Sequence, residues 1–276
     1  CGQALNNALG VYARLGMPGA CCSADGVHVA WNKCRSTQRH LFTGKEGFPT
    51  VAWNVSVLHS REIVHIARWM GGSQNDKTMA QHDVFFARLR SGTFHPEKTY
   101  ALYNRDGTRS VHRGLYAIVD NGYHHWMCLM PPFKGVCPDD ETSMWSKRLE
   151  SVRKDVECTF GTVTHRFRIL RIPSDQATPE GIDNTFRACC VLHNILLRHD
   201  GLNTLGNSAR HWHPQDGEVV RRRRLLDAVR VHRDRTTVRA HGGVPPTREP
   251  GFGARREALI AHYNVARLKG EVGWVK

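Results

Sequence analysis

The chain has 276 residues, of which 39 are Lys or Arg and 25 are Asp or Glu. No apolar run reaches the roughly 18–20 residues that cross a bilayer, so the sequence excludes a membrane-spanning protein. A hydrophobic content of 40% argues against a wholly disordered chain. The excess of positive charge favours a polyanionic partner such as nucleic acid, and the alternative is a basic surface that is simply solvated.

The positive charge is concentrated towards the C-terminus. Residues 201–276 contain 15 basic and 7 acidic side chains, and Gly, Pro, Asn and Arg dominate there. We therefore predict a main domain over residues 1–200 and a basic C-terminal extension over residues 201–276, partly helical or disordered. The chain begins at Cys1 and not at a methionine, and nothing before Asn32 resembles a basic-then-apolar signal peptide, so we interpret its start as that of an internal fragment.

The predicted elements mix strands and helices. Alternating apolar and polar residues predict strands at 24–31, 50–59 and 62–69, and their short connections favour an antiparallel meander. After a break at 71–76, residues 78–91 are predicted to be helical, 91–113 to be turn-rich, and 114–119 and 127–130 to be strands. Apolar residues spaced three and four apart then predict helices at 140–170, with a possible interruption at Gly161, and at 178–198.

Nine cysteines are present, and none forms the C-x-x-C spacing of a zinc site. We expect reduced thiols and an intracellular protein. The pairs Cys21-Cys22 and Cys189-Cys190 are interpreted as small apolar core residues. Five tryptophans could stack on bases, although a core role is the favoured interpretation; they are Trp31, Trp53, Trp69, Trp126 and Trp145.

Three acidic residues stand at positions suited to a shared site. Asp25 lies on the first strand, Asp120 follows the strand at 114–119, and Glu157 lies beside the apolar stripe of the long helix. Converging carboxylates bind hard divalent cations, which can activate water for phosphodiester chemistry. Solvated surface acids are the alternative. Asp155 competes with Glu157 for the third position, but it points about 200° away on a helix that turns about 100° per residue.

The segments around these acids resemble characteristic blocks of the DDE transposases of the PIF/Harbinger superfamily, from about Gly16 to Asp200. The matching blocks are GMPGACCSADGVHV around Asp25, GGSQND ending at Asp76, VDNGY around Asp120, RKDVECTFGTVTHRFRIL around Glu157, and ACCVLHNIL at 188–196. Their order along the chain is also that of the family.

The resemblance implies an α/β fold of the RNase H-like type, in which helices flank a mixed five-stranded sheet. It implies that Asp25, Asp120 and Glu157 are catalytic and hold two Mg²⁺ or Mn²⁺ ions. Asp76 is expected as a supporting metal ligand, or alternatively as a turn or helix cap. The implied activity is a metal-dependent DNA endonuclease or transposase that hydrolyses phosphodiesters at transposon ends, with strand transfer to follow.

The same resemblance implies DNA as the partner, together with a separate DNA-binding protein, a possible homodimer and a nuclear location. Expected DNA contacts are Arg153, Arg166 and Arg168, and the run Arg221, Arg222, Arg223 and Arg224, for which a solvated arm is the alternative. The competing functional hypothesis is a domesticated, catalytically inactive DNA-binding or scaffold protein on the same fold.

Overall fold

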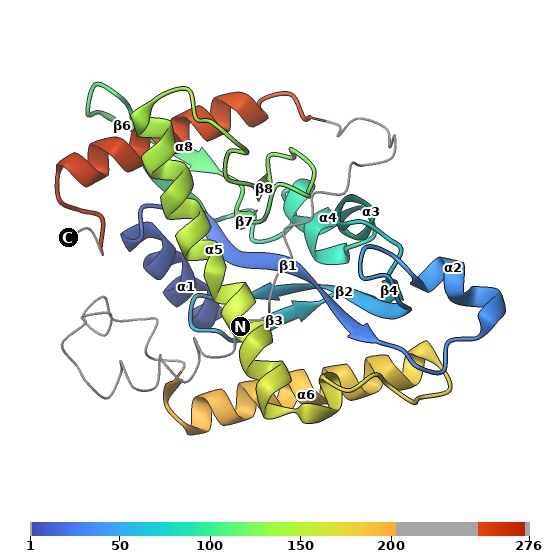
Figure 1. Cartoon of the computed structure of the whole chain (residues 1–276). Helices are drawn as coiled ribbons and strands as arrows, with labels where there is room; N and C mark the ends of the chain where they lie inside the picture. Colours follow the sequence, from blue (N-terminus) through green and yellow to red (C-terminus); the bar gives the residue numbers. More distant parts are fainter. Residues whose placement is uncertain (1, 203–247, 274–276) are drawn as a thin grey trace.

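A mixed sheet with helices on both sides forms the centre of the molecule, as a computed structural model covering residues 2–202 and 248–273 shows (Figure 1). The first half of the chain contains α1 (Gly2–Arg14), β1 (Ala20–Ala30), η1 (Ser36–Gln38), α2 (Arg39–Phe42), β2 (Thr50–Val57), β3 (Ile63–Ile66), β4 (Met70–Gly71), α3 (Asp76–Gln81), α4 (Val84–Arg90), β5 (Thr99–Tyr103) and β6 (Arg109–Arg113). It is followed by β7 (Tyr116–Ile118), β8 (Leu129–Met130), α5 (Asp140–Arg166), η2 (Arg168–Leu170), α6 (Pro179–His199) and α8 (Phe252–Leu268).

The main sheet has the order β3-β2-β1-β7-β8, with β4 also paired to β2. The predicted meander is confirmed, because β1 pairs antiparallel with β2, and β2 with β3. β7 joins β1 in parallel and β8 joins β7 in parallel. Five strands were expected, and the sheet has six, because β3 and β4 pair one after the other with the same edge of β2. At the end of β3, Arg187 of α6 donates to the carbonyl oxygens of Ile66 and Ala67.

Two groups of buried side chains form the core. One face of β2 presents Val51, Trp53, Val55 and Val57 to the apolar sides of α5 and α6. The other group joins α1, the start of β1, β7, β8 and the first half of α5. As predicted, the cysteine pairs at 21–22 and 189–190 are buried, and so are four of the five tryptophans, whereas Trp69 is half-buried.

The long helix α5 crosses the sheet over β1 and β2. It is continuous through Gly161 and ends at Arg166, where the predicted helix ran to 170. Asp139 caps its first turn by accepting from the backbone N–H of Thr142 at 2.7 Å, which supplies one of the hydrogen bonds that a helix start lacks.

Three local predictions differ from the structure. The helix expected at 78–91 is split into α3 and α4, because the Asp83 carboxylate accepts from the N–H groups of Phe85 and Phe86 and starts a new helix. The turn-rich region 91–113 contains the hairpin of β5 and β6, whose polar and largely exposed strand β6 carries no apolar signal. α1 has no counterpart among the predicted elements.

α8 belongs to the same core as the sheet. Phe252, Leu259 and Ile260 are buried with residues of β7, β8 and α5. The helix lies in the predicted C-terminal extension yet packs on β5 and α5. The boundary at residue 200 stays a prediction, and Arg221–Arg224 lie outside the described residues. In the described part of the chain, the helices are too short or too polar to cross a membrane.

Candidate acidic site

The sequence-predicted acids approach one another from four separate elements. Asp25 lies in the middle of β1, Asp76 is the first residue of α3, Asp120 follows β7 by two residues, and Glu157 lies on α5. The sheet brings Asp25 and Asp120 near each other, because β1 and β7 run side by side in parallel with Ser23 opposite Ile118.

Asp25 is the most enclosed of the acids, with 6% of its surface exposed. Burial raises its pKa from 3.8 to about 6, and the negative charges of Asp120 and Asp76 add to that rise, whereas Arg153 opposes it. A Cβ atom placed on Gly26, the neighbour of Asp25, would lie 3.1 Å from Oδ1 of Asp76, so Asp76 lies close to Asp25.

Gly122 shows how tightly two of these acids converge. A Cβ atom placed on Gly122 would lie 2.5 Å from Oδ2 of Asp76 and 2.9 Å from Oδ1 of Asp120. The backbone N–H of Gly122 also donates to Oδ1 of Asp120 at 2.8 Å, which orients that carboxylate. The glycine of the VDNGY segment is thus required by the close approach of both side chains.

Glu157 reaches the other acids through Arg153. Nη1 of Arg153 donates to Oδ2 of Asp25 at 3.1 Å, and Nη2 donates to Oε1 of Glu157 at 2.6 Å. Arg153 and Glu157 are one turn apart on α5, which places both side chains on the same face of the helix. The side chain of Glu157 is 37% exposed, so this edge of the site is open to solvent.

Asp155, the rival of Glu157, lies on a different side of α5. Its carboxylate forms a buried ion pair with Nδ1 of His59, and the side chains are 8% and 3% exposed respectively. Asp155 therefore connects α5 to the segment after β2. The N-cap of α3 is Asn75, whose side chain accepts from the N–H of Thr78, so the capping position is not that of Asp76.

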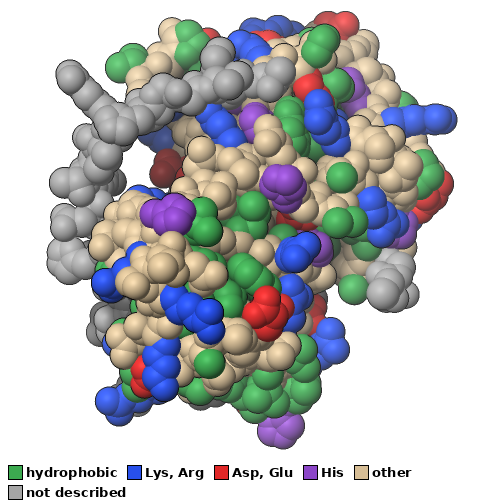
Figure 2. Space-filling model, turned by 90° about the vertical axis from the view of Figure 1, so that its right-hand side faces the viewer, with side chains coloured by type: hydrophobic (Ala, Val, Ile, Leu, Met, Phe, Trp, Pro, Cys, Tyr) green, Lys and Arg blue, Asp and Glu red, His purple; other side chains and the backbone are tan. Residues whose placement is uncertain are grey.

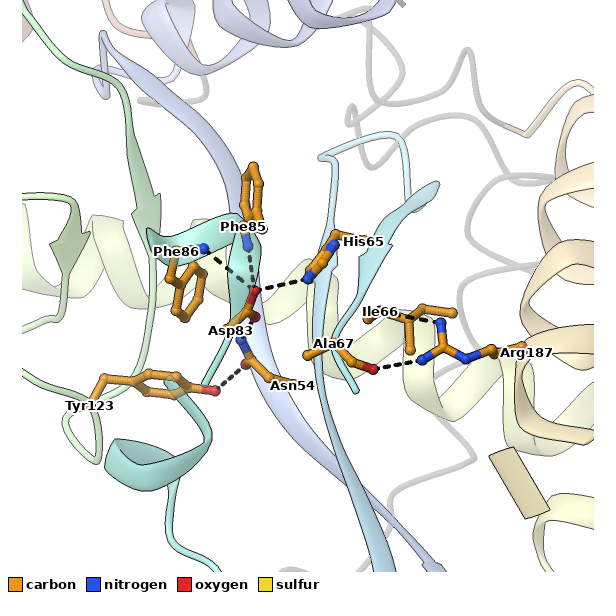
Figure 3. A network of polar contacts seen from close by, with 9 residues as sticks. All are labelled: Asn54, His65, Ile66, Ala67, Asp83, Phe85, Phe86, Tyr123 and Arg187. Atoms are coloured by element: carbon orange, nitrogen blue, oxygen red, sulfur yellow. Dashed lines mark hydrogen bonds and ion pairs between the residues drawn. The ribbon is translucent and has the colours of Figure 1, made fainter. Parts of the chain in front are cut away.

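A buried polar network supports the loop that follows Asp120 (Figure 3). The hydroxyl of Tyr123 donates to Oδ1 of Asn54 at 2.7 Å, and the amide of Asn54 donates to Asp83. Asp83 also accepts from Nε2 of His65 at 2.9 Å. The network joins the loop after β7 to β2, β3 and the start of α4. Burial raises the pKa of Tyr123 well above its usual value, and the nearby negative charge of Asp25 adds to this.

The sequence patterns did not point to this network. Asn54 is its one sequence signal, since it is a buried polar residue within the otherwise apolar centre of β2. A buried amide of this kind requires hydrogen-bond partners, which only the fold supplies.

The arginines expected to contact DNA differ in their surroundings. Arg153 is buried and bound to two carboxylates. Arg166 pairs with Asp200, its Nη2 lying 2.9 Å from Oδ2. Arg168 is exposed in η2. Of these three, Arg168 has the position most accessible to a large ligand.

The four carboxylates have the chemistry of a divalent cation site, but they are not arranged so that they could coordinate one ion together. Four carboxylates accompany one guanidinium, which leaves excess negative charge. Within residues 2–202 and 248–273, no three His, Cys, Asp or Glu side chains are placed so that they could hold a metal ion together. Asp25 and Glu157 instead share Arg153.

Comparison with known proteins places these residues in a family. A family model described as plant transposon protein matches residues 2–203, a span that includes all four acids. No curated protein and no solved structure matches the chain. Because the family model covers well over half of the chain, the chain belongs to the plant transposon protein family, which indicates a transposase-related role.

Proposed function

We propose that the chain is the catalytic domain of a DDE-type transposase of the PIF/Harbinger kind, with an RNase H-like fold. Its activity is metal-dependent hydrolysis of DNA phosphodiesters at transposon ends, followed by strand transfer. The observation that carries this proposal is the convergence of Asp25, Asp76 and Asp120 beside Glu157, at a point where burial and then the neighbouring acids raise the pKa of Asp25 to about 6. A fold keeps such mutually repelling groups together at a cost in stability, and that cost is typical of functional sites.

Asp25, Asp120 and Glu157 would hold two Mg²⁺ or Mn²⁺ ions, with Asp76 as a supporting ligand. Carboxylate oxygens are the ligands these ions prefer. When bound, the ions supply an activated water and neutralise charge on the phosphate oxygens. Arg153 would have to release at least one carboxylate for the ligands to assemble, and its guanidinium would then lie at the edge of the site, where a phosphate could accept from it.

The chain's own residues provide a rigid frame for this chemistry. Asp25 lies on a central strand, where it pairs with Val55 of β2, and the preceding part of the strand pairs with β7. Asp120 is oriented by the N–H of Gly122, and its loop is anchored through Tyr123 to Asn54. Such preorganisation places the acids before substrate binds.

The remaining parts of the proposal concern partners. DNA is the substrate, a separate protein supplies recognition of the transposon ends, two copies act together on two ends, and the site of action is the nucleus. Arg168 is a candidate contact because it is exposed, and Arg166 lies nearby in the chain.

A second candidate function is an inactive DNA-binding or scaffold protein on the same fold. One observation favours it: Arg153 pairs with both Asp25 and Glu157 and offsets part of their charge, which stabilises the fold at this point. Metal affinity distinguishes the two candidates, because a scaffold needs no divalent cation.

The test is nicking of supercoiled DNA by the purified chain with Mg²⁺, with Mn²⁺ and with chelator. Asp120→Asn and Glu157→Gln are expected to abolish metal-dependent nicking. Glu150→Gln is the matched control, since Glu150 is exposed on the same helix. Equal nicking by wild type and both site variants would refute the proposal. An inactive wild type that also fails to bind Mn²⁺ in a titration would favour the scaffold function.

A further inference from the structure

An exposed basic segment lies between β1 and β2, next to the acidic site in the fold. Residues 32–48 include η1 and α2 and carry four cationic side chains with one acid, Glu46. We name Lys33, Arg35, Arg39 and Lys45 the basic platform. All four are exposed. The ion pairs formed among the described residues include none of these four, whereas seven other arginines have carboxylate partners.

The platform is fixed to the body of the protein by aromatic packing. Phe42 is buried and packs edge-on against Trp31, with ring centroids 4.8 Å apart, and it stacks on Trp69. The indole N–H of Trp31 donates to the carbonyl oxygen of Gln176 at 2.9 Å. A short bridge between Thr43 and Pro49 closes the base of the segment. Its cations are therefore displayed on an ordered surface.

The same segment is packed against the loop that leads into Asp76. Oγ of Ser73 donates to the carbonyl oxygen of Leu41 at 2.6 Å. A Cβ atom on Gly71 would lie 2.2 Å from that carbonyl oxygen, and one on Gly44 would lie 2.1 Å from the carbonyl oxygen of Gly72. The backbones of the two segments are in direct contact here, which accounts for the paired glycines of the GGSQND segment. The platform and Asp76 are thus parts of one packed unit.

The spacing along β1 relates the platform to the acids. Ala30, the last residue of the strand, is the fifth residue after Asp25, and the platform begins three residues after Ala30. At about 3.3 Å per residue the strand covers roughly 17 Å.

The surface has the composition of a nucleic-acid contact. Leu41 and Phe48, which flank the platform, are each 49% exposed. Figure 2 views the molecule from the side on which α2 protrudes in Figure 1, and Lys, Arg and His side chains are spread over this face among exposed hydrophobic ones. Cations without carboxylate partners bind phosphate and release its counterions.

From these observations we propose that the basic platform binds the phosphate backbone of the duplex DNA whose bond is held at the acidic site. The inference rests on the proposed function for the scissile bond, but the binding surface is testable without cleavage. Phosphate contacts position the duplex and carry no sequence information. The platform would therefore set how DNA enters the site, while sequence recognition comes from elsewhere.

The experiment measures binding of a fluorescent 30-base-pair duplex by anisotropy, with chelator present so that no cleavage occurs. The platform variant is Lys33→Gln, Arg35→Gln, Arg39→Gln and Lys45→Gln combined. The control variant removes the same number of exposed cations from the other end of the fold, with Arg105→Gln, Arg113→Gln, Lys134→Gln and Lys147→Gln. Thermal unfolding of both variants should match wild type, because every altered side chain is exposed.

We expect the platform variant to bind at least about tenfold more weakly at moderate salt, and the control to change by less than about threefold. The slope of log K against log salt should fall by about 0.9 for each phosphate that the variant no longer neutralises. Equal weakening in the two variants would overturn the proposal, because net charge alone would then explain binding. Binding of polyglutamate as tight as that of DNA would also overturn it in favour of an acidic protein partner. If the platform variant loses DNA binding while wild type neither nicks DNA nor binds Mn²⁺, the platform stands and the catalytic proposal fails.

Discussion

Arg153 of α5 binds Asp25 of β1, with Nη1 3.1 Å from Oδ2. The same guanidinium holds Glu157 through its other terminal nitrogen. One cation therefore compensates two of the carboxylates that the sequence assigns to a metal site. In this arrangement the arginine stabilises the acids, and a divalent ion bound as we propose would compete with it for the same oxygens.

The first prediction concerns that competition. Arg153→Met should lower the free energy of unfolding by roughly 2–3 kcal/mol in chelator, because it leaves the buried Asp25 carboxylate without its partner. Mn²⁺ should restore part of the loss. Urea unfolding with and without Mn²⁺ measures both effects. Lys154→Met, which alters the exposed neighbour on α5, is the control and should change little. A loss that Mn²⁺ does not reduce would argue against a metal site at these carboxylates.

A second prediction follows from the pKa of Asp25. Its value of about 6 is raised above 3.8, mainly by burial, so the folded state binds this proton more tightly than the unfolded chain does. The contribution of Asp25 to stability is therefore greatest below about pH 4, and it falls as the pH rises to about 6, after which it is constant. Asp25→Asn removes this penalty and should be more stable than wild type at pH 7 by up to about 3 kcal/mol.

Chemical unfolding from pH 4 to pH 8, in chelator, tests this prediction. The difference between Asp25→Asn and wild type should grow between pH 4 and pH 6 and then level off. The variant should also lose metal-dependent nicking. A variant less stable than wild type at every pH would show that the contact with Arg153 outweighs the repulsion.

The third prediction separates two acids that are two residues apart on α5. Asp155→Ala should destabilise the fold by roughly 3 kcal/mol, because it removes the carboxylate that pairs with the buried His59. Glu157→Gln should change stability by less than about 1 kcal/mol, since the side chain is 37% exposed and an amide oxygen can still accept from Arg153. Thermal melts and the nicking assay on both proteins provide the comparison. If nicking fails only in the Asp155 variant while its fold is intact, the assignment of Glu157 is wrong.

The fourth prediction concerns the network beneath the Asp120 loop. Tyr123→Phe removes the hydroxyl that donates to Asn54 and leaves a buried amide oxygen unpaired, which should cost about 1–2 kcal/mol. We also expect slower nicking, because the loop that positions Asp120 loses an anchor. Tyr100→Phe is a matched control, because Tyr100 lies on β5 and contacts Arg255 of α8 instead of the acids. Equal loss of nicking in both variants would indicate a general effect on the fold.

Particular residues show why some elements could be predicted and others could not. The apolar stripe through Trp145, Leu149, Val152 and Val156 predicted α5, because a helix buried on one side repeats its apolar residues every three to four positions. β6 escaped prediction because Arg109–Arg113 pairs only with β5 and stays largely exposed, so neither face needs apolar residues. The division between α3 and α4 depended on Asp83, which caps α4 with one carboxylate oxygen and accepts from Asn54 with the other.

The sequence by itself determined the alternating meander of β1, β2 and β3, the two long helices α5 and α6, and the identity of four acids that share one site in our proposal. Local periodicity and short motifs carry that information, since both are properties of neighbouring residues. Only the tertiary structure decided how the acids are compensated. It paired Arg153 with Asp25 and Glu157, buried Asp155 against His59, and packed α8 into the core. These outcomes depend on contacts between residues far apart in the chain, and such contacts form only when the strands and helices pack together.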